Sequence, residues 1–128
     1  MSEHPPTDDE LLALADAASA RAYSPYSNFN VGCVVVARDG RIIEGVNVEN
    51  AAYPLGVCAE RTALSRAVVE GFRPGDVEAV GITASPCGGC RQWLHEFRVE
   101  RVAFRRDDGS IAEYTPAELL PDTWNLPG

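Results

Sequence analysis

Two short stretches, Cys58-Ala59-Glu60-Arg61 and Pro86-Cys87-Gly88-Gly89-Cys90-Arg91, decide how the chain is interpreted. They supply three thiols and one carboxylate at the expected starts of two helices. Cys87 and Cys90 are three residues apart, so on one helical turn their side chains share a face and can chelate a metal ion. The helix and strand expected between the two stretches form a compact unit that can return the chain to Cys58. The pattern therefore predicts a metal site built from two adjacent helix starts.

The number of thiols indicates what kind of metal site this is. Three protein ligands leave the fourth position of a tetrahedral zinc ion open, which is typical of catalytic zinc. Backbone N–H groups at helix N-termini should stabilise the thiolates. Glu60 would lie beside the open position, where it can move a proton. Arg61, three positions after Cys58, and Arg91, directly after Cys90, are both candidates for a cation that balances the thiolate charge.

Two other residues could be mistaken for ligands. Cys33 lies inside an apolar strand, and we expect it to be an inert core thiol. His95 is five positions after Cys90, on another face of the same helix, and we expect a solvated side chain.

Length and composition describe a single soluble domain. The 128 residues suit one domain, 1–128, in which residues 1–6 are expected to be disordered. No apolar run approaches the roughly 18 residues of a membrane span, and the N-terminus lacks the pattern of a signal peptide. We therefore expect a cytoplasmic protein with reduced thiols, and no membrane partner. The net charge of −8 opposes binding to nucleic acid and favours a small ligand.

The order of expected elements predicts the fold class. Helices are expected over 8–22, 58–70 and 87–98, followed by a short one after the capping box at 115–118. Strands are expected over 31–37, 41–48, 77–84, 99–105 and 111–114. A hairpin followed by crossover helices favours an α/β fold, a three-layer α/β/α sandwich around a mixed five-stranded sheet.

The hairpin near the N-terminus predicts a second group of side chains. Asp39-Gly40 suits a two-residue turn between the strands 31–37 and 41–48. In that register Phe29 lies beside Asn50, and residues two apart on the returning strand point to one face. We therefore expect three side chains to gather at one end of the hairpin: Phe29, Asn47 and Glu49.

Taken together, the motifs resemble a known family. Cys-Ala-Glu-Arg followed by Pro-Cys-x-x-Cys-Arg-Gln is similar to the zinc-dependent cytidine deaminases, in the small homotetrameric nucleoside class that uses three cysteines. The resemblance covers nearly the whole chain, because three further runs match family motifs in order: 24–32, 45–51 and 118–121.

The resemblance implies a metal centre with one Zn²⁺ per chain. Its ligands would be Cys58, Cys87 and Cys90, and Glu60 would be the catalytic proton shuttle. Two further residues would support the ligands from behind: Arg61 and Gln92.

The resemblance also implies a substrate pocket. Phe29 would stack on the pyrimidine, while Asn47 and Glu49 would hold the ribose. Ala59 would contact the base through its backbone, and Tyr53 would come from, or contact, a neighbouring subunit. A homotetramer with sites at subunit interfaces is implied, and the alanine stripe of the helix over 58–70 is a plausible interface.

The expected reaction is hydrolytic deamination of cytidine and 2′-deoxycytidine to the uridines with release of ammonia, in pyrimidine salvage. Zinc-activated water would attack the base, and Glu60 would carry the protons. Three alternatives stay open: a deaminase of a cytosine-nucleoside antibiotic of the blasticidin S type, a thiol oxidoreductase using Cys87 and Cys90, and a structural zinc module. The segment before Pro86 looks shorter than in the family, and Trp124 stands where the family tends to have phenylalanine.

Overall fold

Strand β1 (Gly32–Ala37) lies inside the sheet, between two other strands, and all of its residues are buried in this computed structural model, which describes residues 5–124. It is antiparallel to β2 (Ile42–Val46) on one side and to β3 (Val77–Ile82) on the other. Next to β3 comes the parallel strand β4 (Arg101–Arg105), and the antiparallel β5 (Ile111–Tyr114) forms the edge. The order β2-β1-β3-β4-β5 confirms the predicted mixed five-stranded sheet.

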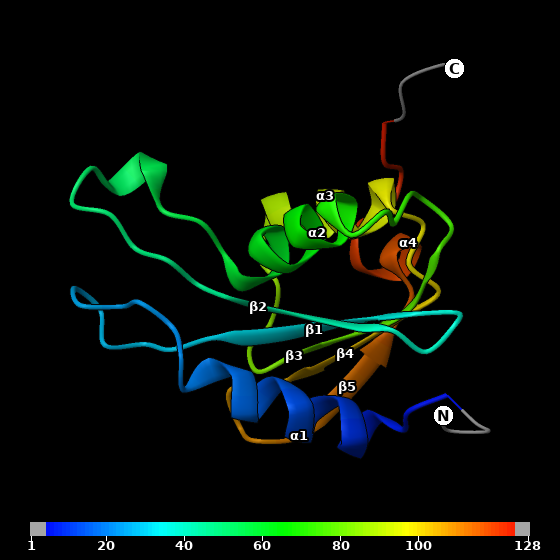
Figure 1. The fold of residues 1–128 in the computed structure, drawn as a ribbon, viewed down its shortest axis with the longest axis horizontal. Helices are drawn as coiled ribbons and strands as arrows, with labels where there is room; N and C mark the ends of the chain where they lie inside the picture. The colour runs from blue at the N-terminus through cyan, green and yellow to red at the C-terminus, as the bar shows by residue number, and fades with distance from the viewer. Residues whose placement is uncertain (1–4, 125–128) are drawn as a thin grey trace.

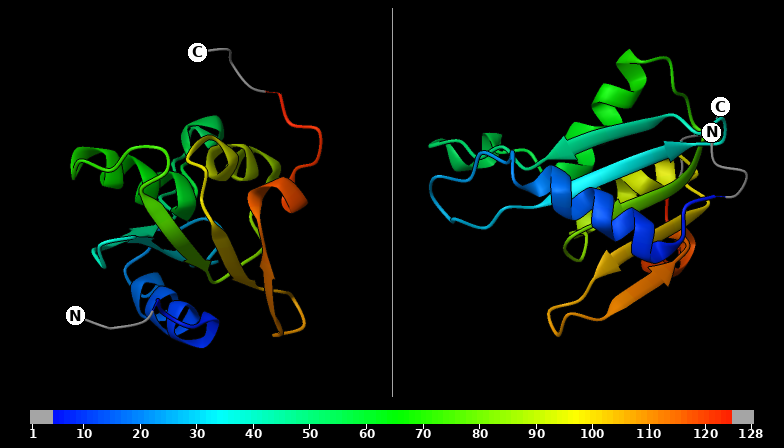
Figure 2. Two further views of the ribbon diagram at one scale, coloured as in Figure 1. Left: turned by 90° about the vertical axis from the view of Figure 1, so that its right-hand side faces the viewer. Right: turned by 60° about the horizontal axis from the view of Figure 1, so that its bottom comes forward.

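Helices cover both faces of this sheet. Helix α1 (Asp8–Ser19) lies on one face, whereas α2 (Ala59–Val69), α3 (Gly88–Glu96) and α4 (Pro116–Leu119) lie on the other, as Figures 1 and 2 show. The predicted three-layer α/β/α sandwich is therefore confirmed. Among the described residues, no helix combines the length and the apolar character needed to cross a membrane.

The strand period divides the core into two halves. Cys33 and Val35 of β1 belong to the core under α2, α3 and α4, whereas Val34 and Val36 pack with Leu11 of α1. Successive side chains of a strand point to opposite faces, so one fully buried strand serves both layers. Cys33 is thus the core thiol that was predicted.

The first helix is shorter than predicted. The prediction of a helix over 8–22 is wrong in its last turn, because the chain turns after Ser19 and becomes extended at Tyr23. The Tyr23 amide donates to the Asn47 carbonyl (3.1 Å), and the Tyr23 carbonyl accepts from the Glu49 amide (2.8 Å). Pairing with the segment after β2 therefore replaces the last helical turn.

The predicted hairpin register is wrong by one residue. The turn contains Arg38, Asp39 and Gly40, and the Ala37 amide donates to the Arg41 carbonyl at 2.9 Å. Gly40 has φ 93°, which suits the left-handed position that closes a three-residue hairpin loop. The ladder ends with Gly32 opposite Val46, so the predicted pairing of Phe29 with Asn50 does not form.

The alanine stripe of α2 packs inside the chain. Ala59, Ala63 and Ala67 are fully buried under the helix. A Cβ on Gly45 of β2 would lie 2.4 Å from the Ala63 amide nitrogen, so the helix can approach this strand only because residue 45 is glycine. The prediction that the alanine stripe is a plausible subunit interface is therefore wrong. Gly71, with φ 96°, follows the end of this helix in the left-handed conformation that glycine favours.

Two loops, residues 24–31 and 47–57, extend side by side beyond one end of the sheet (Figures 1 and 2). The second contains a short 3-10 helix, Tyr53–Leu55, that the sequence did not predict. At the opposite end of the sheet, the Pro6 carbonyl accepts a hydrogen bond from Arg101 (2.7 Å). Residues 1–4 of the segment predicted to be disordered lie outside the described residues.

Candidate metal centre and pocket

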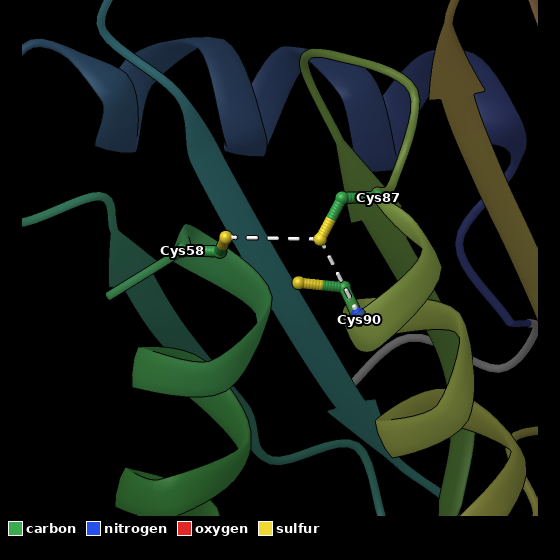
Figure 3. Close-up of side chains that lie close together, drawn as sticks. All are labelled: Cys58, Cys87 and Cys90. Carbon is green, nitrogen blue, oxygen red and sulfur yellow. Dashed lines mark hydrogen bonds between the residues drawn. The ribbon is translucent and has the colours of Figure 1, made fainter. Parts of the chain in front are cut away.

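The three cysteines of the two motifs meet at the starts of α2 and α3. Cys58 is the N-cap residue of α2, Cys87 is the N-cap residue of α3, and Cys90 lies in the first turn of α3. Figure 3 shows the three sulfurs turned toward one another from the two helices. All three sulfurs lie within 4.8 Å of one another. The predicted convergence of these thiols is confirmed.

The thiol cluster has the dimensions of a zinc site. A tetrahedral zinc ion with bonds of about 2.3 Å to sulfur holds its thiolates about 3.8 Å apart. The Sγ atoms of Cys58 and Cys87 are 3.9 Å apart. His95 is half-buried and is not part of this cluster. Three soft ligands at this spacing fit Zn²⁺ and leave room for a fourth ligand.

The helix starts affect the three thiols differently. Burial acts to raise the pKa of Cys87, but hydrogen bonds from the Cys90 backbone amide and from the Cys90 and Cys58 thiols outweigh it, so this pKa is lowered. The Cys90 amide lies 3.5 Å from the Cys87 sulfur. Burial raises the pKa of both Cys58 and Cys90. Stabilisation of a thiolate by backbone N–H groups, predicted for both helix starts, is therefore seen at Cys87.

Arg61 lies directly over the start of α3. Its Nη2 atom is 2.3 Å from the place that a Cβ on Gly89 would occupy, so a side chain at residue 89 would displace the guanidinium. Burial acts to lower the pKa of Arg61. The negative charges of the cysteines, that of Cys90 above all, act in the opposite direction and together are stronger, so the pKa is raised above its ordinary value. The Arg61 Nε is a buried donor without a hydrogen-bond acceptor among the described residues. These contacts fit the predicted role of a cation beside the sulfurs.

Arg91, the other candidate cation, has a different set of partners. Its guanidinium donates to the carbonyls of Pro86 (2.9 Å) and Leu119 (3.0 Å) and to the Ser85 hydroxyl (3.3 Å). Leu119 is the last residue of α4. Arg91 therefore ties the loop before Cys87 to the C-terminal helix, and the expectation that it balances the thiolate charge is not supported by its contacts.

Glu60 occupies the second position of α2 and is only 4% exposed. Burial raises the pKa of its carboxyl group above the ordinary value. A buried carboxyl group with a raised pKa holds a proton more readily than a solvated one, which suits a group that must accept and then release protons. Next to three thiols this is a suitable environment for proton transfer.

A pocket of about 760 Å³ opens beside the thiols, between the two projecting loops. Cys58, Cys87 and Glu60 line its inner end. The residues predicted to contact the substrate also line it: Phe29, Asn47, Glu49, Tyr53 and Ala59. None of the described side chains that line this pocket is basic. A neutral, partly apolar ligand therefore suits the pocket better than an anion.

Three predicted site residues lie outside this lining: Cys90, Arg61 and Gln92. Cys90 belongs to the thiol cluster, and Arg61 lies over the start of α3, as described above. Gln92 lines a separate hollow between α2 and α3, together with Val68, Trp93 and Phe97.

Hydrogen bonds of two side chains, Asn47 and Glu49, shape the outer part of the pocket. The Asn47 Oδ1 atom accepts from the Val31 amide (2.8 Å), and its Nδ2 atom donates to the Phe29 carbonyl (2.8 Å). Glu49 Oε1 accepts from the amides of Tyr26 (3.0 Å) and Ser27 (3.1 Å). Tyr26 and Ser27 line the pocket but were not predicted individually, because the matching run 24–32 does not by itself show which of its side chains face a ligand.

Comparison with known proteins agrees with this geometry. Residues 5–106 match the family model described as the cytidine and deoxycytidylate deaminase zinc-binding region. The chain is 43% identical over 123 residues to the cytidine deaminase of Halalkalibacterium halodurans, covering 88% of this chain and 92% of that protein. The relative from Sporosarcina psychrophila, also named cytidine deaminase, is 41% identical over 125 residues, covering 91% of this chain and 90% of that protein.

Among solved structures, the cytidine deaminase from Burkholderia pseudomallei superposes with a TM-score of 0.86. It is 40% identical in sequence, and the match covers 92% of this chain and 99% of that one. A family model that spans most of the chain, relatives of this similarity and a matching fold lead to one conclusion: the chain belongs to the cytidine and deoxycytidylate deaminase zinc-binding family.

Proposed function

We propose that this protein hydrolyses cytidine and 2′-deoxycytidine to uridine and 2′-deoxyuridine and releases ammonia. The observation that carries the proposal is the juxtaposition of a buried carboxyl group, Glu60, with three converging thiols at the inner end of one pocket. The pocket also contains an aromatic side chain and polar groups suited to a nucleoside: Phe29, Asn47 and Glu49.

Cys58, Cys87 and Cys90 would hold one Zn²⁺ per chain. When bound, this ion supplies Lewis acidity that makes a water molecule nucleophilic at neutral pH. Arg61 offsets the negative charge of the three thiolates, and Gln92 is proposed to support the ligands from α3. A net charge closer to zero strengthens the acidifying effect of the metal.

Glu60 carries the protons of the reaction. Its carboxylate accepts a proton from the attacking water and delivers it to N3 of the pyrimidine while the new C4–O bond forms. The remaining hydroxyl proton then passes through Glu60 to the amino group on C4, which leaves as ammonia. One water is consumed and the carboxylate is regenerated, so the proton balance closes.

Phe29 stacks on the pyrimidine ring, and the backbone at Ala59 contacts the edge of the base. Asn47 and Glu49 hold the ribose, each with hydrogen-bonding capacity beyond the bonds that shape the loop. Tyr53, whose side chain is 92% exposed at the rim of the pocket, would come from, or contact, a neighbouring subunit.

This exposure supports a homotetramer with sites at subunit interfaces. Large apolar side chains are exposed on both projecting loops, including Tyr26, Phe29 and Leu55. The acidic chain, a single domain over residues 1–128, would act in the cytoplasm as an enzyme of pyrimidine salvage, without nucleic-acid or membrane partners.

The pocket favours a free nucleoside over a nucleotide. A phosphate group normally requires Arg, Lys or several backbone N–H groups. The described side chains of the lining include two carboxylates, Glu49 and Glu60, and no Arg, Lys or His. A thiol oxidoreductase is not favoured, because a pair formed by Cys87 and Cys90 needs neither a third thiol nor a buried glutamate.

Initial rates on cytidine, 2′-deoxycytidine, cytidine monophosphate and blasticidin S test this proposal, with uridine and ammonia quantified together. We expect equimolar uridine and ammonia from cytidine, comparable turnover of 2′-deoxycytidine, and little product from the nucleotide. A preference for blasticidin S would overturn the substrate assignment, and ammonia-free consumption of a disulfide substrate would overturn the reaction class.

A further inference from the structure

Phe29 has no core packing to hold it in place. Its side chain is 61% exposed, and the preceding residue, Asn28, has the left-handed φ of 59°. The backbone of Phe29 is instead held by side chains at both of its polar groups. The amide donates to the Ser27 hydroxyl (3.0 Å), and the carbonyl accepts from Asn47 Nδ2 (2.8 Å). Hydrogen bonds therefore hold the backbone from which this ring projects.

The Ser27 hydroxyl has a second partner. It donates to Oε2 of Glu49, while the Ser27 amide donates to Oε1 (3.1 Å). An ionised carboxylate can only accept, so the single hydroxyl proton of Ser27 points to Glu49 and its lone pair receives the Phe29 amide. The three groups form one polarised chain from the Phe29 N–H through the Ser27 O–H to the Glu49 carboxylate. Bonds in such a chain strengthen one another.

The same contacts limit what Glu49 can do for a ligand. A carboxylate offers about four acceptor positions, two on each oxygen. Oε1 accepts from the amides of Tyr26 and Ser27, and Oε2 accepts from the Ser27 hydroxyl. One position on Oε2 is left for a hydroxyl group of the substrate. Ser27 contacts both oxygens and so sets the direction in which that position points.

We propose that Ser27 is a positioning residue that links sugar recognition by Glu49 to base stacking by Phe29. The inference rests on the proposed function, in which those two residues contact the nucleoside. Ser27 then acts on binding and not on proton transfer, since Glu60 lies at the other end of the pocket. Loss of its hydroxyl releases the carboxylate and the Phe29 backbone together.

The experiment compares Ser27→Ala with two matched variants. Ser27→Thr keeps the hydroxyl. Ser110→Ala removes a similar bond at a remote place, because the Ser110 hydroxyl donates to Asp108 Oδ1 (2.6 Å) in an exposed turn. KM and kcat for cytidine, the affinity for uridine by calorimetry, the zinc content and the melting temperature are measured for each protein and for wild type.

We expect Ser27→Ala to raise KM and weaken uridine binding by about tenfold, with kcat within about threefold of wild type. Ser27→Thr and Ser110→Ala should resemble wild type in both measurements. In the double variant with Glu49→Gln, the loss of binding free energy should be smaller than the sum of the losses in the two single variants, since Ser27 and Glu49 act through one hydrogen bond.

Three results would overturn the proposal: an unchanged KM in Ser27→Ala, a loss in Ser27→Thr equal to that in Ser27→Ala, or full additivity with Glu49→Gln. A loss in kcat alone would also contradict a binding role. Failure of the proposed function is distinguishable, because it would appear as absence of cytidine turnover in wild type and in Ser110→Ala.

Discussion

The guanidinium of Arg61 fills the space that a side chain on Gly89 would need, with Nη2 2.3 Å from the position of a Cβ there. Gly89 lies between the two cysteines of α3, so this contact joins the charge on α2 to the metal-binding turn of α3.

Substitution of Gly89 by alanine should therefore weaken zinc binding. The added methyl group pushes the guanidinium away from the sulfurs, and we expect zinc affinity to fall by about tenfold or more. Gly88→Ala is the matched control, because a Cβ on Gly88 would meet nothing within 4 Å. Competition with a chromophoric chelator measures both affinities. Equal affinities for the two variants would contradict the contact.

The four cysteines should separate into two classes. Cys87→Ser should lose its zinc, because one of three converging thiolates is removed. Cys33→Ala should keep its zinc and lose only about 1 kcal/mol of unfolding free energy, as expected for a small buried side chain. Atomic absorption and urea unfolding check the two variants. Loss of zinc from Cys33→Ala would show that the fourth thiol is not merely part of the core.

Arg91 should matter for stability through its three acceptors. Replacement by alanine leaves the carbonyls of Pro86 and Leu119 without this donor, and we expect a loss of about 2–3 kcal/mol of unfolding free energy. Arg106→Ala, which removes an exposed arginine bonded to the Tyr114 hydroxyl, should cost less than about 1 kcal/mol. Urea denaturation of both variants measures the two losses of unfolding free energy. Equal losses would contradict a stabilising role for the hydrogen bonds from Arg91 to Pro86 and Leu119.

Two glutamates should titrate on opposite sides of the ordinary value of 4.5. The hydrogen bond from the Ser27 hydroxyl, opposed by slight desolvation, holds the pKa of Glu49 below it. A hydrogen bond with Asp8, then desolvation and the Asp8 charge, hold the pKa of Glu113 above it. Side-chain carbon NMR titration measures both values, and Ser27→Ala should raise the pKa of Glu49.

The two shifts act on stability with opposite signs. Glu49 contributes stability that is present above its unfolded-state pKa and is lost as the pH falls through its lower folded-state pKa. The contribution of Glu113 is present below its unfolded-state pKa and is lost as the pH rises through its higher folded-state pKa. If the two carboxyl groups titrated at the same pH, both the lowered pKa of Glu49 and the raised pKa of Glu113 would be contradicted.

The metal cluster was predictable because most of its geometry is local. Cys87 and Cys90 share a helical face wherever that helix lies, and only the approach of Cys58 depends on the tertiary fold. The helices and strands could be predicted for a similar reason, since the apolar run of β1 and the capping box at 115–118 are properties of short segments. The hairpin register could not be predicted, because Asp39-Gly40 suits either a two-residue or a three-residue loop. The choice between the two loops shifts every pair of residues by one.

The partners of long side chains were harder to infer. Arg61 and Arg91 both lie within three residues after a cysteine, yet Arg61 reaches over Gly89 whereas Arg91 reaches the end of α4. The sequence does not distinguish these two directions. Ala59, Ala63 and Ala67 indicate close packing but not what packs on them, and the answer is Gly45 of the same chain. Ser27 carried no signal because its partners are 22 residues away at Glu49 and two away at Phe29.

The most direct measurement is zinc content together with cytidine turnover for wild type and Glu60→Gln. The amide keeps the shape of the buried side chain and removes its ability to carry a proton. We expect equal zinc in both proteins and turnover reduced by at least about a hundredfold in the variant. A Glu60→Gln protein that contains zinc and deaminates cytidine at the wild-type rate would contradict the assignment of Glu60 as the proton carrier.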